Sequence, residues 1–121
     1  MELERIAAAV AGHGAVAGVL AAEPPGGGRA YLVALGEGDE RRWLAVDARA
    51  RPLEDRAAVR EVASLVALCE VAAELAGEED AARVASPAYL DAVGTPGLAS
   101  ATGVVEAFVA EVLDRYRLPL R

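Results

Sequence analysis

Two apolar runs, residues 29–35 and 41–48, are joined by only five residues, and this spacing restricts the folds open to the chain. The connection, Gly-Glu-Gly-Asp-Glu, is polar and glycine-bearing, as hairpin loops are. A parallel crossover takes roughly a dozen residues or more, so the two runs are predicted to pair antiparallel. A third apolar run, residues 15–23, precedes them. The sequence therefore predicts a three-stranded antiparallel meander.

The connection between the runs 15–23 and 29–35 comprises residues 24–28 and reads Pro-Pro-Gly-Gly-Gly. This glycine run raises the question of a phosphate-binding loop. Such loops run from a strand through glycines into a helix, whose N-terminal N–H groups face the anion. Here Arg29 and an apolar strand follow, and the sequence contains no Gly-Lys-Ser/Thr and no GxGxxG. We predict that these glycines only turn the chain between two strands.

Helices are predicted before and after the meander in the sequence. Residues 3–10 carry an apolar face at helical spacing, which Gly12 and Gly14 interrupt. Pro52 and the acids that follow it mark the start of the longest helix, which is expected to end near Gly77. That helix is apolar over most of its circumference and should lie in the middle of the packing; its main stripe comprises Val59, Val62, Val66, Cys69 and Ala73.

The last third of the chain is predicted to form shorter helices. Residues 78–80 open one with acids in its first turn, residues 86 and 87 start another that stops at Gly94, and residues 95–97 form a turn. In a final amphipathic helix, Glu111 and Arg115 are expected to pair on the outer side. Its apolar stripe comprises Val105, Phe108, Val109, Val112 and Tyr116.

This element order predicts an α+β fold in a single domain, residues 1–121. We expect two layers: an N-terminal helix, a three-stranded antiparallel meander, then a long central helix and two or three further helices packed on the sheet. The first part of this order is also that of double-stranded-RNA-binding domains. Such domains dock a lysine-rich helix start on phosphates, whereas residues 52–56 contain no lysine and two acids. The resemblance is therefore one of element order only.

The charge of the chain argues against partners that bind through phosphates. Nineteen acids stand against 12 arginines and no lysine, for a net charge of −7. Binding to nucleic acid or to an anionic membrane relies on basic side chains, so neither is expected. The absence of lysine, asparagine and glutamine indicates the coding bias of a GC-rich genome, and we expect a bacterial source.

The single cysteine, Cys69, excludes an internal disulfide and fits a reducing compartment. Residues 6–22 superficially resemble a signal peptide, but the five residues before them carry more acid than base, and glycines interrupt the apolar segment. We therefore expect a cytoplasmic protein. Because Cys69 falls on the apolar stripe of the long helix, a buried, unreactive thiol is predicted.

His13 is the only histidine, so a metal site built from several histidines of one chain is excluded. Because it lies between two glycines in a predicted loop, it is a weak candidate for a general base. An ordinary loop histidine is the alternative that we favour.

Three glutamates, Glu70, Glu74 and Glu78, are spaced four residues apart with no basic residue between them. Like charges at this spacing repel on a helix, which favours a compensating cation such as Mg²⁺. All-α nucleotide pyrophosphohydrolases place carboxylates on helices in a similar manner. A solvated acidic strip is the alternative, and we favour it.

Four arginines, Arg41, Arg42, Arg49 and Arg51, form a local positive cluster near Trp43. Arginine and tryptophan are enriched in binding sites, so a carboxylate or phosphate site is one interpretation. The other, which we favour, is that these arginines pair with acids nearby in the sequence: Glu37, Asp39, Glu40 and Asp47.

Function is predicted from apolar surface in excess of what one small domain buries. We expect a small, acidic, non-catalytic interaction or regulatory module without a cofactor, which forms a homodimer through a sheet edge or helix faces and could bind another protein. The alternative is an enzyme, either an Mg²⁺-dependent hydrolase using the three glutamates or a small-molecule site near His13 and Trp43.

Overall fold

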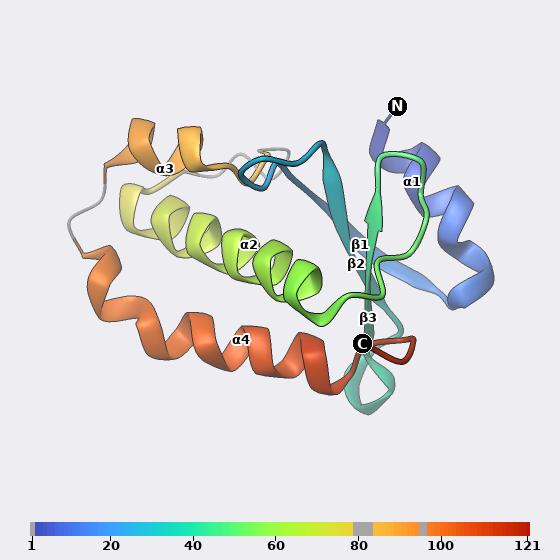
Figure 1. Cartoon of the computed structure of the whole chain (residues 1–121). Coiled ribbons are helices and arrows are strands. Elements are labelled where there is room, and N and C mark those ends of the chain that lie inside the picture. Colours follow the sequence, from blue (N-terminus) through green and yellow to red (C-terminus); the bar gives the residue numbers. More distant parts are fainter. Residues whose placement is uncertain (1, 79–83, 95–96) are drawn as a thin grey trace.

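The computed structural model describes residues 2–78, 84–94 and 97–121 of the chain. Helix α1 (Glu2–Val10) is followed by strands β1 (Val16–Ala22), β2 (Ala30–Leu35) and β3 (Arg42–Asp47), and then by helices α2 (Arg56–Ala76), α3 (Pro87–Val93) and α4 (Thr102–Asp114). Short 3-10 helices lie at Ala11–His13, Gly38–Glu40 and Leu98–Ala101. The α+β fold predicted from the sequence is confirmed (Figure 1).

The three strands form one antiparallel sheet in the order β1-β2-β3, as the short connections predicted. Val19 of β1 pairs with Val33 of β2, which in turn pairs with Leu44 of β3. Gly36 is required at the turn from β2 towards β3, because its φ is +72° and an added Cβ would lie 2.8 Å from the carbonyl oxygen of Glu40. A register shift between residues 16 and 18 marks a bulge in β1.

Each face of the sheet is covered by a helix from within the chain (Figure 1). Tyr31 and Val33 are buried with Ile6 and Val10 of α1, whereas Leu32 is buried against α2 on the opposite face. The two-layer expectation is therefore wrong, because α1 forms a layer of its own. The excess of apolar surface is also smaller than predicted, since most of the apolar content of the sheet is buried inside the chain.

Helix α2 lies in the middle of the packing, as its sequence predicted, in contact with β1, β2, α3 and α4. It begins later than expected: Asp55 is its N-cap and accepts the backbone N–H of Ala58 at 3.1 Å. Pro52 lies outside the helix because residues 51–53 run beside β3, where the Leu53 N–H donates to the Ala45 carbonyl oxygen. The expected left-handed glycine, Gly77, ends the helix.

Helix α4 ends at Asp114, earlier than predicted, because the chain then turns to bond the outer side of β3. The Trp43 N–H donates to the Arg115 carbonyl oxygen at 3.0 Å, and the Arg117 N–H donates to the Trp43 carbonyl oxygen at 2.7 Å. Tyr116 therefore lies beyond the helix. The expected Glu111–Arg115 pair is replaced, since Glu111 accepts from the Trp43 indole and Arg115 donates to the Asp39 carbonyl oxygen.

Two smaller predictions about the C-terminal half are confirmed. Ser86 is the N-cap of α3 and accepts the Tyr89 N–H at 3.0 Å, and Gly94 ends this helix in the left-handed conformation. Cys69 is buried, and its Sγ lies 3.7 Å from the Ser86 carbonyl oxygen. The short helix expected from residue 78 falls on residues 79–83, outside the described residues, as do residues 95 and 96 of the expected turn. Across the described ranges, no helix combines the length and apolarity that crossing a membrane takes.

Candidate functional site

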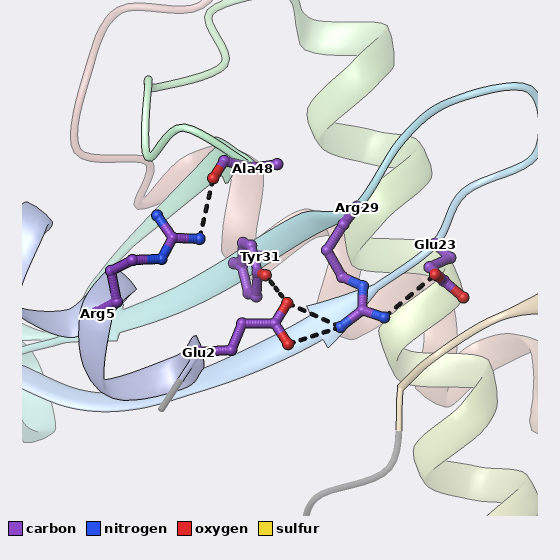
Figure 2. Close-up of polar contacts among 6 residues, drawn as sticks. All are labelled: Glu2, Arg5, Glu23, Arg29, Tyr31 and Ala48. Atoms are coloured by element: carbon purple, nitrogen blue, oxygen red, sulfur yellow. Dashed lines mark hydrogen bonds and ion pairs between the residues drawn. The ribbon is translucent and has the colours of Figure 1, made fainter.

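A polar cluster fastens α1 to the sheet (Figure 2). The Tyr31 hydroxyl donates to the Glu2 carboxylate, and Arg29 donates through Nη1 to both Glu2 oxygens, at 2.8 and 2.9 Å. The other Nη of Arg29 bonds Glu23 at 3.2 Å. Figure 2 shows the Arg29 guanidinium lying between the two carboxylates. These contacts join α1, the end of β1 and the start of β2.

The contacts in this cluster shift the pKa values of Glu2 and Tyr31 in opposite directions. The Tyr31 hydrogen bond, with the nearby Arg29 charge, lowers the pKa of Glu2 despite some desolvation. Burial and the adjacent carboxylate raise the pKa of Tyr31. Glu2, Glu23 and Arg29 all have partners within the cluster, and these contacts hold α1 on the sheet.

The turn that follows β3, residues 47–51, is fixed from several directions. Asp47 Oδ1 accepts the backbone N–H groups of Arg49 and Arg51 at 2.9 and 3.0 Å, and Oδ2 accepts Arg51 Nε at 3.2 Å. Arg5 of α1 donates to the Ala48 carbonyl oxygen at 3.1 Å (Figure 2). Burial alone would raise the pKa of Asp47, but the two backbone donors, the Arg51 charge and the Arg51 side-chain hydrogen bond together lower it. The turn is thus held in one shape around Asp47.

A hollow of about 600 Å³ lies beside this turn, and we call it the glycine-loop hollow. Its walls are the loop of residues 24–28, the 47–51 turn and the first turns of α2. Ala30, Leu53, Ala58 and Val62 supply its apolar lining. The glycine run therefore does more than connect two strands, because it forms one wall of a cavity of the size that small ligands occupy.

The outer edge of β1 is partly covered. At its end, Ala85 bonds β1 through two backbone contacts: its N–H donates to the Ala21 carbonyl oxygen at 2.9 Å, and its carbonyl oxygen accepts the Glu23 N–H at 2.8 Å. Backbone groups point outward at alternate residues of an antiparallel strand, so Val19 also directs its N–H and C=O away from β2. Ala17 and Gly18 are exposed and Val19 is partly exposed. These three residues form the β1 edge segment.

An apolar hollow of about 460 Å³ continues from this edge between α2 and α4, and we call it the α2–α4 hollow. Leu20, directly after the β1 edge segment, lines it together with Val71 of α2 and with Val104 and Phe108 of α4. Val104 is 63% exposed. Within residues 2–78, 84–94 and 97–121, only this side chain and Leu75 are large, apolar and strongly exposed.

His13 lies in the 3-10 helix after α1 and is partly exposed. Its carbonyl oxygen accepts Arg117 Nε at 3.0 Å, so the backbone of His13 supports the C-terminal segment that bonds Trp43. The general-base role remains a prediction.

The three glutamates are not all on one helical face. Glu70 and Glu74 lie on α2 and line the α2–α4 hollow, whereas Glu78 follows the left-handed Gly77 outside the helix. The Schellman-type bond from the Glu78 N–H to the Ala73 carbonyl oxygen turns the chain there. In the part of the chain that is described, no three histidine, cysteine, aspartate or glutamate side chains are grouped as a metal site requires.

The predicted arginine cluster is divided between the two ends of β3. Arg41 and Arg42 lie at its start and Arg49 and Arg51 beyond its end. The length of β3, roughly 17 Å from residue 42 to residue 47 at about 3.3 Å per residue, therefore separates the two pairs. Arg51 pairs with Asp47 at 3.2 Å, whereas Arg41 stacks on the Trp43 ring, 5.6 Å from its centroid.

Trp43 itself is buried. Its indole Nε1 donates to Glu111 Oε2 at 3.1 Å, and its ring meets Phe108 edge-on at 5.2 Å. It joins β3 to α4 and contributes no exposed aromatic surface to a site.

Sequence reasoning missed the two features that define these surfaces. The Tyr31–Glu2 contact joins residues 29 positions apart, and no local sequence pattern predicts such a contact. The pairing of Ala85 with β1 was also missed, since a single bridge leaves no alternating pattern. The lack of any charge in Val16–Ala22 was a readable signal for an open strand edge.

Comparisons of the chain with protein-family models, with curated proteins and with solved structures find no match.

Proposed function

We propose that this chain is a non-catalytic interaction module that forms a homodimer through the β1 edge segment and the α2–α4 hollow. The observation that carries the proposal is an exposed, uncharged strand edge continuous with an apolar hollow. In such a dimer, β1 pairs antiparallel with β1 of a second copy, and the two sheets join into one of six strands. The Val104 and Leu20 side chains are then buried between the copies.

The chemistry of the edge favours a second copy. Monomeric proteins protect exposed edges with charged side chains, proline or strong bulges. β1 has a bulge near its start, but its seven residues, Val-Ala-Gly-Val-Leu-Ala-Ala, include neither proline nor charge. An edge of this kind is complementary to itself, since two antiparallel copies offer each other the same N–H and C=O groups.

The charge of the chain favours contact at the same place. Each copy carries a net charge of −7, so two copies repel at most relative orientations. The β1 edge segment has no charge, and the charged side chains that line the α2–α4 hollow are Glu70 and Glu74. Association is therefore least opposed electrostatically where uncharged strand meets uncharged strand.

We also propose a cytoplasmic location. The sequence contains a single cysteine, so the chain can form no internal disulfide, and this fits a reducing compartment. Neither a catalytic group nor a cofactor is needed for the function proposed.

The test is the molar mass of the chain in solution, measured by light scattering from low micromolar to millimolar concentration. We expect the mass to approach twice that of one chain. Ala17→Lys places a charge on the edge, and Val104→Glu places one at the apolar hollow. Each should raise the dimer dissociation constant at least tenfold, about 1.4 kcal/mol.

Ala9→Lys, on the exposed side of α1, is the matched control and should leave the dissociation constant unchanged. A wild-type chain that remains a monomer at millimolar concentration contradicts the proposal. So does a dimer that tolerates both interface substitutions.

A further inference from the structure

We propose that the glycine-loop hollow binds a small molecule with an apolar body and a single anionic group, a carboxylate or a phosphate ester, which pairs with Arg49. This site lies at the end of the sheet where Ala22, Ala30 and Asp47 are neighbours, beyond the part of β1 that Ala85 covers. It does not depend on the proposed dimer.

The shape of the hollow suits such a molecule. Its volume of about 600 Å³ falls within the range of small-molecule sites, roughly 300–1,000 Å³. Ala30, Leu53 and Val62 form an apolar floor that belongs to the buried core on the α2 side of the sheet. Gly27 and Gly28 form the facing wall without side chains, so the opening is not filled. An apolar group can therefore enter against the floor.

The contacts within the 47–51 turn determine which arginine side chain can pair with an anionic ligand. Asp47 accepts from the backbone of Arg49 and Arg51 and pairs with the Arg51 side chain, so the Asp47 and Arg51 charges largely compensate each other. The Arg49 guanidinium makes no hydrogen bond to any described residue, although its backbone is held. Arg29 is not a candidate, since Glu2 and Glu23 already occupy its guanidinium (Figure 2).

The turn also carries backbone strain. Ala50 has a φ of +62°, and it is the one described residue other than glycine with a positive φ. Such a conformation costs roughly 1–2 kcal/mol and is retained where the surroundings enforce it, often at binding sites. Here it allows residues 49 and 51 to present their N–H groups to the same Asp47 oxygen while both flank the hollow.

Glu61 restricts the charge of the ligand. It lies on α2 and lines the hollow. A second anionic group on the ligand would be repelled there, whereas one anion at the Arg49 end satisfies the site. Guanidinium groups bind carboxylate and phosphate in the same two-pronged geometry, so both chemistries are included and the test separates them.

The test uses benzoate, phenyl phosphate and the neutral benzyl alcohol, titrated into the ¹⁵N-labelled full chain and followed by NMR. We expect saturable shifts of the Gly27, Gly28 and Arg49 amide signals with one or both anions and at least tenfold weaker binding of benzyl alcohol. Saturation by benzoate alone, or by phenyl phosphate alone, identifies the anionic group.

Two substitutions, one that removes a positive charge from the 47–51 turn and one that removes a negative charge from α2, then test the roles of Arg49 and Glu61. Arg49→Gln should weaken anion binding at least tenfold, and Glu61→Gln should strengthen it. Arg42→Gln, at the other end of β3, is the control and should have no effect. The proposal is overturned if no signal shifts at millimolar anion, if benzyl alcohol binds as well as the anions, or if Arg49→Gln binds like the wild type.

Discussion

The Ala85 N–H donates to the carbonyl oxygen of Ala21 at 2.9 Å, and this contact marks where the outer edge of β1 changes from covered to exposed. The outer edge of β3, in contrast, is bonded along its length by residues 51–53 and 115–117. Among the residues that the structure describes, the sheet is thus left with one exposed edge of three residues, next to the apolar α2–α4 hollow. Our account of association rests on this asymmetry.

Salt should strengthen the dimer. Two copies repel because each has a net charge of −7, and salt screens this repulsion. The hydrogen bonds between uncharged strands are not weakened by the same screening. Raising the salt concentration from about 50 mM to about 500 mM, where the screening length is shorter, should lower the dissociation constant measured by sedimentation. Weaker association in high salt would indicate an interface of ion pairs and contradict our assignment.

Acid should destabilise the chain through Glu2. Its folded-state pKa is lowered from the ordinary value of 4.5, chiefly by the Tyr31 hydrogen bond. The unfolded state therefore binds the proton first, and the contribution of Glu2 is lost as pH falls below that ordinary value and through the lower folded-state pKa. Asp47 adds to the same trend. Glu2→Gln should be less stable than the wild type at neutral pH and lose less stability on acidification, by urea unfolding. Glu4→Gln on the same helix should behave as the wild type.

Removing the Tyr116 hydroxyl should cost about 1–3 kcal/mol of unfolding free energy. This hydroxyl accepts the Ala45 N–H at 3.1 Å and lies within hydrogen-bond distance of the Leu53 carbonyl oxygen, so Tyr116→Phe leaves buried backbone groups unsatisfied. Trp43, the single tryptophan, reports the urea transition by its fluorescence. An unfolding free energy equal to that of the wild type would show that Tyr116 does not tie the C-terminal segment to β3.

High pH should act through the same residue. Burial raises the pKa of Tyr116 to about 12. Its folded-state pKa is thus above the unfolded value, so its contribution is complete below about pH 10 and is lost as pH rises towards 12. Tyrosinate absorbance should show a tyrosine that ionises together with the loss of native fluorescence. Because the pKa of Tyr31 is raised as well, Tyr116→Phe is needed for the assignment and should remove this step. Tyr116 ionising at its ordinary pKa in the folded chain would contradict this.

Relief of strain at Ala50 should stabilise the chain. Because Ala50 has a φ of +62°, glycine there avoids a steric cost, and Ala50→Gly is expected to raise the unfolding free energy by up to about 1 kcal/mol. Ala48→Gly, in the same turn at a negative φ, should lower it. Equal destabilisation by both substitutions would show that the turn is not strained at Ala50.

Much of the fold could be predicted from the sequence because its signals are local. The five-residue connection required an antiparallel pair, and the all-round apolar face of α2 required a central helix. Ends of elements were less predictable. Pro52 looked like a helix start, but the Leu53–Ala45 bond draws that segment to β3, and a similar bond from Arg117 to Trp43 ends α4 early.

The candidate surfaces were less predictable for the same reason. Arg49 and Arg51 were found as part of a cluster, yet neither their separation from Arg41 nor their position beside the glycine loop is visible in a linear pattern. Both depend on the register of β3 against β2, which brings Asp47 opposite Ala30.

The measurement that tests the central claim most directly is amide hydrogen exchange at Val19 as a function of protein concentration. Its N–H points out from the exposed edge of β1, so it should exchange rapidly in dilute solution and become protected as the dimer forms. Ala17→Lys should abolish that protection. An exchange rate for Val19 that is the same at every concentration, whether fast or slow, would contradict pairing of β1 with a second copy of this chain.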